Sequence, residues 1–402
     1  MATTGTRQRK EKDTHYRLVI IGGGLMGSAI AYFLSADKAF SGSILVVEKD
    51  PSYGRCSSSL SAGGIRTQFS TPENVLISKF GAEFLKNARH YLSIEGEEID
   101  LSFKERGYLF LATERGWSTL QANAALQNSL GARIDLLAPS QLRRLFPDLR
   151  VTDLAGGALG RENEGWLDAY SLLMAFRRKA LRCSVQYRNA GVTGLTQAHQ
   201  RITGLYINGS EYITCDAVVN AAGPAAAHIA RMAGVELPVQ SRKRQVFVVA
   251  CPKAVRLPMV IDPSGVYIRE EGHAYLCGTS PPPDRDPESF DFSVEEELFY
   301  DTIWPLLAHR IPAFENLRLE SSWAGHYAYN TLDQNAVLGA HPRIGNFYFC
   351  NGFSGHGLQQ SPAVGRALAE LITYGKYQSL DLTQFGFDRF AENRLIVEKN
   401  VV

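Results

Sequence analysis

The stretch from Arg17 to Glu48, RLVIIGGGLMGSAIAYFLSADKAFSGSILVVE, decides the fold of this chain. Arg17 to Ile21 is a β-branched apolar run that ends at three glycines, and Leu25 to Ala36 has apolar residues at helical spacing. Ser43 to Glu48 is a second run typical of a buried strand. Strand, glycine turn, helix and strand in this order predict one βαβ unit that opens a nucleotide-binding sheet.

The glycine turn, GGGLMG at residues 22–27, matches the pattern G-x-G-x-x-G. Gly22 permits the tight turn, Gly24 lets a pyrophosphate approach the backbone, and Gly27 lets the helix pack closely on the strand. The start of the helix offers unpaired N–H groups and partial positive charge to a phosphate. Glu48, at the end of the second strand, is expected to accept the ribose hydroxyls. The plain alternative is an ordinary glycine turn with a solvated Glu48, and the motif alone does not choose between NAD and FAD.

The composition describes an ordinary globular protein with little preference for polyanions. In 402 residues, 42 basic and 41 acidic side chains leave a formal charge of +1, which argues against nucleic acid or an anionic membrane as the main partner. The length suits two domains or one bilobal unit. No apolar stretch is long enough to predict a transmembrane span.

The six cysteines lie far apart, and none forms a C-x-x-C pair. This spacing excludes the common zinc and redox motifs, so we predict no metal site and free thiols in a reducing compartment, with a cytoplasmic location. Residues 1–15 are polar and are predicted to be a disordered tail. Their Glu and Asp residues disfavour a mitochondrial transit peptide.

Further along the chain, the middle is rich in antiparallel strand patterns, and the end returns to strand, loop and helix. Strand patterns occur at 108–112, 157–159, 185–187, 192–213, 217–220, 245–249, 266–268, 274–277 and 346–350, and helical patterns at 76–92, 120–131, 169–181, 294–310 and 363–371. Asp168 is a plausible N-cap for the third of these helices. The Gly-rich stretch 351–362, NGFSGHGLQQSP, is predicted to be a loop that opens a helix at about Ser361-Pro362.

Four ordered motifs together resemble the D-amino-acid-oxidase-like superfamily of FAD-dependent oxidoreductases. They are the glycine turn, SSSLSAGGIR at 57–66, VVNAAGP at 218–224 and GFSGHG at 352–357. The superfamily includes sarcosine oxidase, glycine oxidase and dimethylglycine dehydrogenase, and the resemblance runs from about Arg17 to about Leu382.

Three longer strings, at 63–74, 321–339 and 352–362, are similar to one subgroup of that superfamily. The subgroup holds a mitochondrial protein linked to assembly of respiratory complex I, together with its bacterial relatives. This closer resemblance does not reveal a substrate.

The superfamily resemblance implies an α/β fold in which a Rossmann-type FAD-binding domain is interleaved with an antiparallel-sheet-rich substrate domain. The expected FAD-binding domain comprises residues 16–98, 155–237 and 333–402. The expected substrate domain comprises residues 99–154 and 238–332.

The resemblance also implies which residues hold FAD, which is expected to be non-covalent. By position, the ADP moiety would lie at Gly22, Gly24, Leu25, Met26, Gly27, Glu48 and Lys49; the pyrophosphate and flavin edge at Ser58, Ser59, Gly63 and Gly64; the adenine at the backbone of Val192; the pyrophosphate side at Ala222 and Gly223; and the flavin pyrimidine at Gly355, His356, Gly357 and Leu358. Backbone N–H groups suit the pyrimidine because the reduced flavin carries negative charge near N1 and O2.

In this superfamily a hydride leaves the carbon beside a neutral amine and reaches flavin N5, so the resemblance implies an enzyme acting on CH–NH or CH–NH₂ donors. The expected substrate is a secondary or N-methylated amino acid or a related amine. A substrate carboxylate needs a facing cation, and the candidates are Arg66 and Arg269, each with a surface salt bridge as the plain alternative. Tyr267 is a further candidate for the pocket wall, although an aromatic residue on such a strand is more often core.

Three positions depart from the amine oxidases of the superfamily. The cysteine that bonds to flavin in sarcosine oxidases is replaced by His326, so dissociable FAD is expected and a histidyl linkage is the alternative. The position of the lysine that favours oxygen attack falls near Leu276, and no lysine is present there. This absence favours a dehydrogenase that passes electrons to another, unknown acceptor. The substrate-binding lysine is replaced by Gln359, which implies a less acidic or larger substrate, or one held by Arg66 alone.

Two other functions remain open from the sequence. One is an FAD-stabilised assembly factor whose partners are respiratory complex I subunits and whose catalysis is secondary, located in the mitochondrial matrix or at the inner membrane if the source is eukaryotic. The other is an NAD-dependent dehydrogenase, which the second and third cofactor motifs disfavour.

Overall fold

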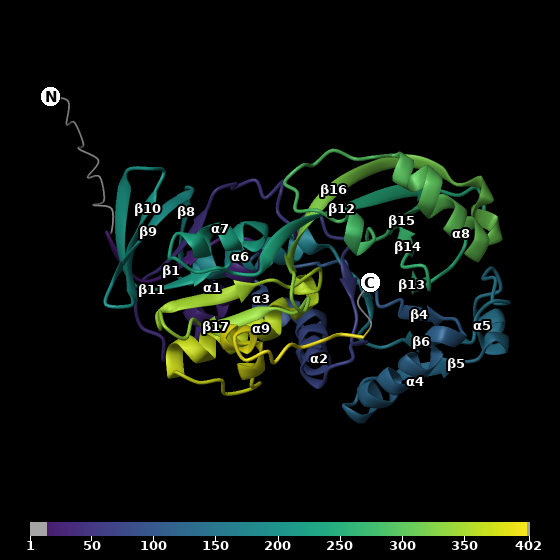
Figure 1. Cartoon of the computed structure of the whole chain (residues 1–402), viewed down its shortest axis with the longest axis horizontal. Coiled ribbons are helices and arrows are strands. Elements are labelled where there is room, and N and C mark those ends of the chain that lie inside the picture. The colour runs from purple at the N-terminus through teal and green to yellow at the C-terminus, as the bar shows by residue number, and fades with distance from the viewer. Residues whose placement is uncertain (1–13, 400–402) are drawn as a thin grey trace.

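The computed structural model describes residues 14–399. Of the tail predicted at residues 1–15, residues 1–13 lie outside the described range. The prediction is wrong at His15, which begins the first strand and pairs with Thr214. Figure 1 shows two lobes side by side, each built around one sheet, with helix α2 (Pro72–Lys86) at the junction between them.

The first sheet is the nucleotide-binding type predicted from residues 17–48. Its strand order is β17-β18-β11-β1-β2-β8, with β9 and β10 attached to β11. Its strands are β1 His15–Ile21, β2 Ile44–Glu48, β8 Gln186–Asn189, β9 Val192–Ala198, β10 Arg201–Ile207, β11 Glu211–Asn220, β17 Val337–Ala340 and β18 Phe347–Asn351. The central strand β1 pairs in parallel with both β2 and β11. Because helices cover it, β1 is apolar along most of its length.

Helices pack on this sheet through small residues. The helices of this lobe are α1 Leu25–Ala36, α3 Ala88–Leu92, α6 Ala169–Arg182, α7 Ala226–Arg231 and α9 Gly357–Tyr374. A Cβ on Gly365 of α9 would lie 2.9 Å from the Cβ of Ala29, so α1 and α9 are in close contact. The predicted N-cap is confirmed, because Asp168 accepts hydrogen bonds from the backbone N–H groups of Tyr170 and Ser171 at the start of α6.

The second sheet has the order β16-β12-β15-β14-β13-β4-β6-β5. Its strands are β4 Tyr108–Ala112, β5 Ile134–Leu137, β6 Gly156–Gly160, β12 Val239–Ala250, β13 Met259–Ile261, β14 Tyr267–Glu271, β15 Ala274–Gly278 and β16 Arg318–Asn330. All neighbours are antiparallel except β4 and β13. The predicted α/β fold with an antiparallel-rich second part is therefore confirmed.

The remaining elements are short or flank the second sheet. They are helices α4 Glu114–Ser129, α5 Pro139–Leu145 and α8 Trp304–Arg310; a small β3 Gly64–Ile65 and β7 Gly165–Trp166 pair; the 3₁₀ turns η1 Gly223–Ala225, η2 Pro283–Arg285, η4 Pro312–Asn316, η5 Thr383–Phe385 and η6 Phe387–Phe390; and the π-helical turn η3 Phe299–Ile303.

Several element boundaries differ from the sequence predictions, for example the helix predicted at 120–131, which is α4, and the helix predicted at 76–92, which is α2 and α3. The helix expected at 294–310 is divided into η3 and α8, because Pro305 has no N–H to donate to the preceding turn. The helix expected at Ser361-Pro362 begins at Gly357, and Ser361 Oγ donates to the Leu358 carbonyl (2.9 Å) that Pro362 leaves without a backbone donor. Strand β6, assigned to the FAD-binding part by the boundary at 155, pairs with β4 and β5 in the second sheet. The division into domains otherwise stays a prediction.

The described residues include no helix that is both long and apolar enough to span a bilayer. Within the same range, no cluster of three His, Cys, Asp or Glu side chains could hold a metal ion. All six cysteines are free thiols.

Candidate functional site

The glycine turn between β1 and α1 has the geometry of an anion cradle. Gly22 has a φ of +100°, and a Cβ on Gly27 would lie 1.9 Å from the Gly22 carbonyl oxygen. No side chain caps α1, and the backbone N–H groups of Leu25, Met26 and Gly27 have no acceptor among residues 14–399. The turn therefore leaves room and donors for a phosphate.

Glu48 lies at this turn, as the sequence predicted. Its Oε2 accepts from Gly23 N (2.8 Å) and its Oε1 from Asp50 N (2.8 Å), which fixes the carboxylate while leaving further lone pairs on both oxygens. Lys49 is exposed next to it. The Glu48 carbonyl accepts from Ala190 N (3.0 Å). Val192, two residues after Ala190 at the start of β9, is half-buried.

The turn after β11 meets the glycine turn directly. A Cβ on Gly22 would lie 2.4 Å from the Ala221 carbonyl oxygen and 3.0 Å from Ala222 Cα. Gly223 has a φ of +54° and open space where its Cβ would be. The glycine turn at 22–27 and the VVNAAGP motif at 218–224 thus lie next to each other.

The serine-rich segment after β2 contributes polar atoms that lack protein partners. The hydroxyls of Ser57 and Ser59 are buried and have no hydrogen-bond partner in the described chain, and Ser58 is half-buried between them. Gly63 has a φ of +78°, and a Cβ there would lie 2.4 Å from the Leu167 carbonyl oxygen. Buried hydroxyls without partners fit a polar ligand that covers them.

The loop before α9 only partly matches the predicted flavin cradle. His356 N donates to the Phe353 carbonyl (2.9 Å), so its N–H is engaged within the turn, contrary to the prediction that it faces a ligand. Gly357 and Leu358, in the first turn of α9, have N–H groups with no acceptor among the described residues. At Gly355, the Tyr327 ring approaches to 2.6 Å of the position that a Cβ would take.

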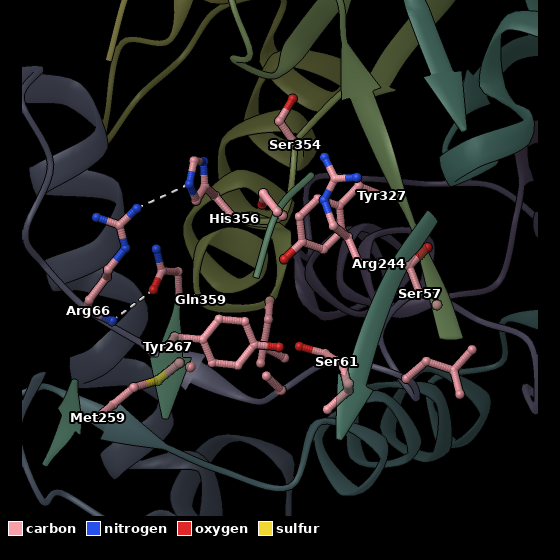
Figure 2. Close-up of a pocket in the computed structure, with 18 of the residues that line it drawn as sticks. Ser57, Ser61, Arg66, Arg244, Met259, Tyr267, Tyr327, Ser354, His356 and Gln359 are labelled. Carbon is pink, nitrogen blue, oxygen red and sulfur yellow. Dashed lines mark hydrogen bonds between the residues drawn. The ribbon is translucent and has the colours of Figure 1, made fainter. Parts of the chain in front are cut away.

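A cavity between the two sheets collects most of the predicted catalytic residues. It is lined by Ser57, Leu60, Ser61, Ala62, Gly64, Arg66, Tyr108, Arg244, Val246, Met259, Ile261, Tyr267, Thr279, Ser280, Gly325, His326, Tyr327, Ser354, Gly355, His356, Leu358 and Gln359. Figure 2 shows Arg66, His356 and Gln359 grouped on one side, with Arg244 and Tyr327 on the other and Tyr267 below.

Arg66 is held rigidly in the wall of this cavity. It is 5% exposed, its Nη1 donates to the Gln68 carbonyl, and its Nη2 lies 3.1 Å from His356 Nε2 (Figure 2). Its guanidinium also lies over the Phe69 ring, 4.1 Å from the ring centre. Since arginine can only donate, His356 Nε2 must accept, and the imidazole is neutral with its proton on Nδ1. Desolvation and then the Arg66 charge lower the pKa of His356 to about 3.

Gln359 connects α9 to Arg66, which directly follows β3. Its Oε1 accepts from Arg66 N (2.8 Å), and its Nε2 has no partner in the described part of the chain. The carbonyl is therefore engaged, and the amide N–H₂ is the group that faces the cavity.

Tyrosines and one histidine complete the wall. Burial raises the pKa of Tyr108 to about 12, raises that of Tyr267 well above its usual value, and also raises that of Tyr327. All three phenols are thus neutral near pH 7. His326 lies in this wall as well, and its Nε2 is buried with no partner in the described chain. Desolvation lowers its pKa, so this ring too is neutral.

Arg269 does not join Arg66. Its Nε donates to the Ala62 carbonyl (2.8 Å), its Nη1 contacts Glu271, and its side chain lines a second cavity beside the first. The two arginines predicted as alternatives therefore lie on opposite sides of the segment around Ala62.

Several residues of the cavity gave no signal in the sequence. Arg244 donates to both carboxylate oxygens of Asp286 (2.7 and 2.9 Å) and lies over the Tyr327 ring, although nothing in the run Arg242-Lys243-Arg244 singles it out. Glu164 does not line the cavity, but it is fully buried and accepts from Thr67 N, Thr67 Oγ1 and Gln68 Nε2, which fixes the two residues that follow Arg66. Burial raises the pKa of this carboxyl.

Comparison with known proteins supports the assignment of this site. The chain matches the DAO family, described as FAD dependent oxidoreductase, over residues 17–371. It is 43% identical to FAD-dependent oxidoreductase domain-containing protein 1 of Xenopus laevis, over 96% of this chain and 84% of that protein. It is 26% identical to the mitochondrial sarcosine dehydrogenase of Homo sapiens, over 93% of this chain and 41% of that protein.

Among solved structures, L-proline dehydrogenase from P. horikoshii is similar with a TM-score of 0.85 and 29% sequence identity, covering 96% of this chain and 100% of that one. The glycine cradle, the unpaired helix N–H groups and the partnerless serine hydroxyls all fit a bound dinucleotide. The resemblance inferred from the motifs is confirmed: the chain belongs to the DAO family of FAD-dependent oxidoreductases.

Proposed function

We propose that the chain oxidises a C–N bond of a secondary or N-methylated amino acid or a related amine, with Arg66 holding the substrate carboxylate. The observation that carries this proposal is a buried guanidinium in a cavity wall that no carboxylate of the described residues contacts directly, since Glu164, which interacts with it electrostatically, is hydrogen-bonded to Thr67 and Gln68 instead. No carboxylate in the described chain forms an ion pair with Arg66, which is 5% exposed. A buried cation is costly unless an opposite charge pairs with it, and arginine pairs with carboxylates in two-point contacts.

The names of two relatives support this substrate class. Sarcosine dehydrogenase and L-proline dehydrogenase are both named for secondary amino acids, molecules that carry a carboxylate close to the amine. A site with one free cation and otherwise neutral donors matches that pattern of charge.

The cofactor would be held along the path that the glycine turn begins. We propose that the N–H groups of Leu25, Met26 and Gly27 bind the pyrophosphate, the Ser57 hydroxyl binds the flavin edge, and Gly357 and Leu358 donate to the pyrimidine. Bound FAD supplies the acceptor for the hydride that leaves the carbon beside the nitrogen.

The chain's own task is then to hold a neutral amine in place. The cavity is lined by no Asp, Glu or Lys among the described residues, so no ionised side chain there is suited to take the amine proton. By pairing with the substrate carboxylate, Arg66 instead offsets the negative charge that raises the pKa of the neighbouring amine, which favours the neutral form of the amine. Tyr267 and the Gln359 amide are neutral donors placed to orient the substrate.

The direct test is anaerobic bleaching of the flavin absorbance by a panel of N-methylated and cyclic amino acids, each paired with its decarboxylated analogue. We expect at least one amino acid to bleach the flavin and its analogue to require far higher concentrations. Replacing Arg66 with Gln should raise the half-saturating concentration about tenfold to a hundredfold, while the exposed control Arg143→Gln changes nothing. If no member of the panel bleaches the flavin, the proposal fails.

We further propose that the enzyme is a dehydrogenase. The position of the oxygen-activating lysine falls near Leu276, and no lysine lies between Lys253 and Lys376. Reduced enzyme should therefore react slowly with air and quickly with an artificial electron acceptor. Equal rates with both would contradict the proposal.

A role as an FAD-stabilised assembly factor for respiratory complex I is the alternative. The similarity to FAD-dependent oxidoreductase domain-containing protein 1, a name without a substrate, keeps this alternative in view. Co-purification with complex I subunits that survives Arg66→Gln and Gln359→Ala would favour assembly. If these two changes instead abolish the function of the protein in cells, catalysis is favoured over assembly.

A further inference from the structure

A second cavity adjoins the first on the other side of a single stretch of chain. Ser59 and Ser61 line the second cavity, whereas Leu60, Ser61 and Ala62 line the first. Two side chains of the second cavity brace this wall, because Trp323 Nε1 donates to the Leu60 carbonyl (3.0 Å) and Arg269 Nε donates to the Ala62 carbonyl (2.8 Å). The two cavities are therefore separated by one backbone segment.

The lining of the second cavity combines apolar side chains with four basic and three acidic ones. It is lined by Ser59, Ser61, Ser102, Lys104, Arg106, Trp166, Leu167, Asp168, Ala169, Tyr170, Val248, Arg256, Arg269, Glu270, Glu271, Gly272, Leu276 and Trp323. Two tryptophans, Leu276 and Val248 supply flat apolar surface. The Arg269 guanidinium lies over the Trp166 ring, 5.4 Å from its centre.

The charges in the lining are unevenly compensated. Arg256 pairs with Glu270 (3.1 Å) and Arg269 pairs with Glu271. Asp168 is engaged as the N-cap of α6. Lys104 and Arg106 are exposed, and neither has a carboxylate partner among the described residues. Lys104 and Arg106 together outweigh Asp168, so the charge left unpaired in the lining is net positive, which favours an anion with an aromatic body.

We propose that this second cavity binds the electron acceptor of the enzyme, a planar anionic molecule of the quinone type. The inference rests on the function proposed above, in which the flavin lies in the first cavity against the segment 57–62. A quinone bound beyond that segment would accept two electrons from the reduced flavin and two protons, one from the flavin and one from water. It would leave as the hydroquinone, without displacing the amine or its product from the first cavity.

Binding can be measured without turnover, because Trp166 and Trp323, two of the four tryptophans, line the second cavity. Anthraquinone-2-sulfonate, added to the oxidised FAD-loaded protein, should quench tryptophan fluorescence. The double variant Lys104→Glu, Arg106→Glu should weaken this binding about tenfold or more. The control Arg143→Glu, Arg144→Glu makes the same change of charge on exposed residues of α5, which contributes nothing to the cavity, and should leave binding unchanged.

Electron transfer is tested separately, after reduction of the flavin with dithionite so that no amine is needed. Reoxidation by the anionic dye dichlorophenolindophenol should slow about tenfold in Lys104→Glu, Arg106→Glu, while reoxidation by the cationic dye phenazine methosulfate does not slow. Reduction by an active amine should be unaffected. Unchanged quenching and reoxidation, or equal losses in the α5 control, would overturn the acceptor site, whereas failure of every amine to reduce the flavin would overturn only the proposed substrate.

Discussion

Arg66 and His356 meet at 3.1 Å in the cavity wall, and each sets the chemistry of the other. The arginine fixes the imidazole as a neutral acceptor, and the imidazole holds the guanidinium without neutralising its charge. A carboxylate in place of His356 would pair with Arg66 and remove the free charge that the proposed substrate requires. The pair therefore keeps Arg66 in position and still available for a ligand.

The lowered pKa of His356 predicts acid sensitivity. Its pKa falls from the usual 6.5 to about 3 in the folded chain, so below pH 6.5 the unfolded chain takes up a proton that the folded chain does not. The contribution to stability is complete above pH 6.5 and is lost progressively as the pH falls towards 3. Between pH 7.5 and pH 5 we expect a loss of about 1–2 kcal/mol in the free energy of unfolding.

Urea unfolding at these two pH values measures this contribution. In His356→Gln, whose amide oxygen can still accept from Arg66, the extra loss at pH 5 should disappear. An identical pH dependence in both proteins would show that His356 does not carry it.

At the scale of elements, helix α1 packs against the glycine turn so closely that position 27 has no room for a side chain. Gly27→Ala places a methyl group 1.9 Å from the Gly22 carbonyl oxygen, a backbone contact that only displacement of α1 can relieve. We expect FAD affinity to fall at least about tenfold, seen as a lower flavin absorbance relative to the protein band.

The matched control is Gly116→Ala in α4, where the nearest atom to the new methyl is the Ala112 Cβ at 3.6 Å. This variant should keep its full flavin content. Flavin loss of equal size in both variants would contradict the role of the close contact at Gly27.

The start of helix α2 is held by a residue that lies more than three hundred positions away. The Glu398 carboxylate accepts from Ser70 N (2.7 Å), Ser70 Oγ (2.6 Å), Thr71 Oγ1 (2.6 Å) and Asn74 Nδ2 (2.7 Å), while Thr71 itself makes no side-chain cap. Glu398→Ala removes the acceptor of the Ser70 and Thr71 donors, while Asn74 Nδ2 keeps its bond to Asn335 Oδ1, and should cost about 1–3 kcal/mol in urea unfolding. Glu392→Ala, which removes only an exposed contact to Arg394, should cost much less; equal costs would show that Glu398 does not stabilise the start of α2.

At the scale of the molecule, the end of the chain returns across the first lobe and reaches the region between the lobes (Figure 1). A fully buried ion pair fixes this return, since Arg389 donates to both carboxylate oxygens of Asp333 (2.8 and 3.0 Å) and both side chains are 0% exposed. Arg389 also donates to the carbonyls of Phe385 and Asn335. The pair thus joins the closing segment to the turn between β16 and β17.

Removing one partner of this pair should be severe. Arg389→Met leaves Asp333 buried without its counterion, and we expect the free energy of unfolding to fall by about 3–5 kcal/mol. Arg394→Met breaks a half-exposed pair with Asp388 and should cost less than about 1 kcal/mol. Comparable losses in the two variants would mean that the buried pair does not fasten the chain end.

The sequence by itself determined the elements whose geometry is local. The bounds of α1 and β4, the glycine cradle and the Asp168 cap follow from apolar periodicity, glycine freedom and N-cap chemistry, which act within a few residues. The FAD family followed from motifs for the same reason, because each motif is a short segment with its own backbone requirement.

Only the tertiary structure decided how these segments meet. Pairing β6 with β4, directing Arg269 away from Arg66, and bringing Arg244, Asp286 and Tyr327 to one wall all depend on contacts between distant parts of the chain. The predicted start of α9 at Ser361-Pro362 is wrong, since the helix begins at Gly357. Gly357 and Pro362 disfavour a helix locally, whereas packing and the Ser361 hydroxyl support one. Local physics therefore fixed the cofactor class, while long-range packing determined which arginine lies in the wall of the first cavity without an ion pair among the described residues.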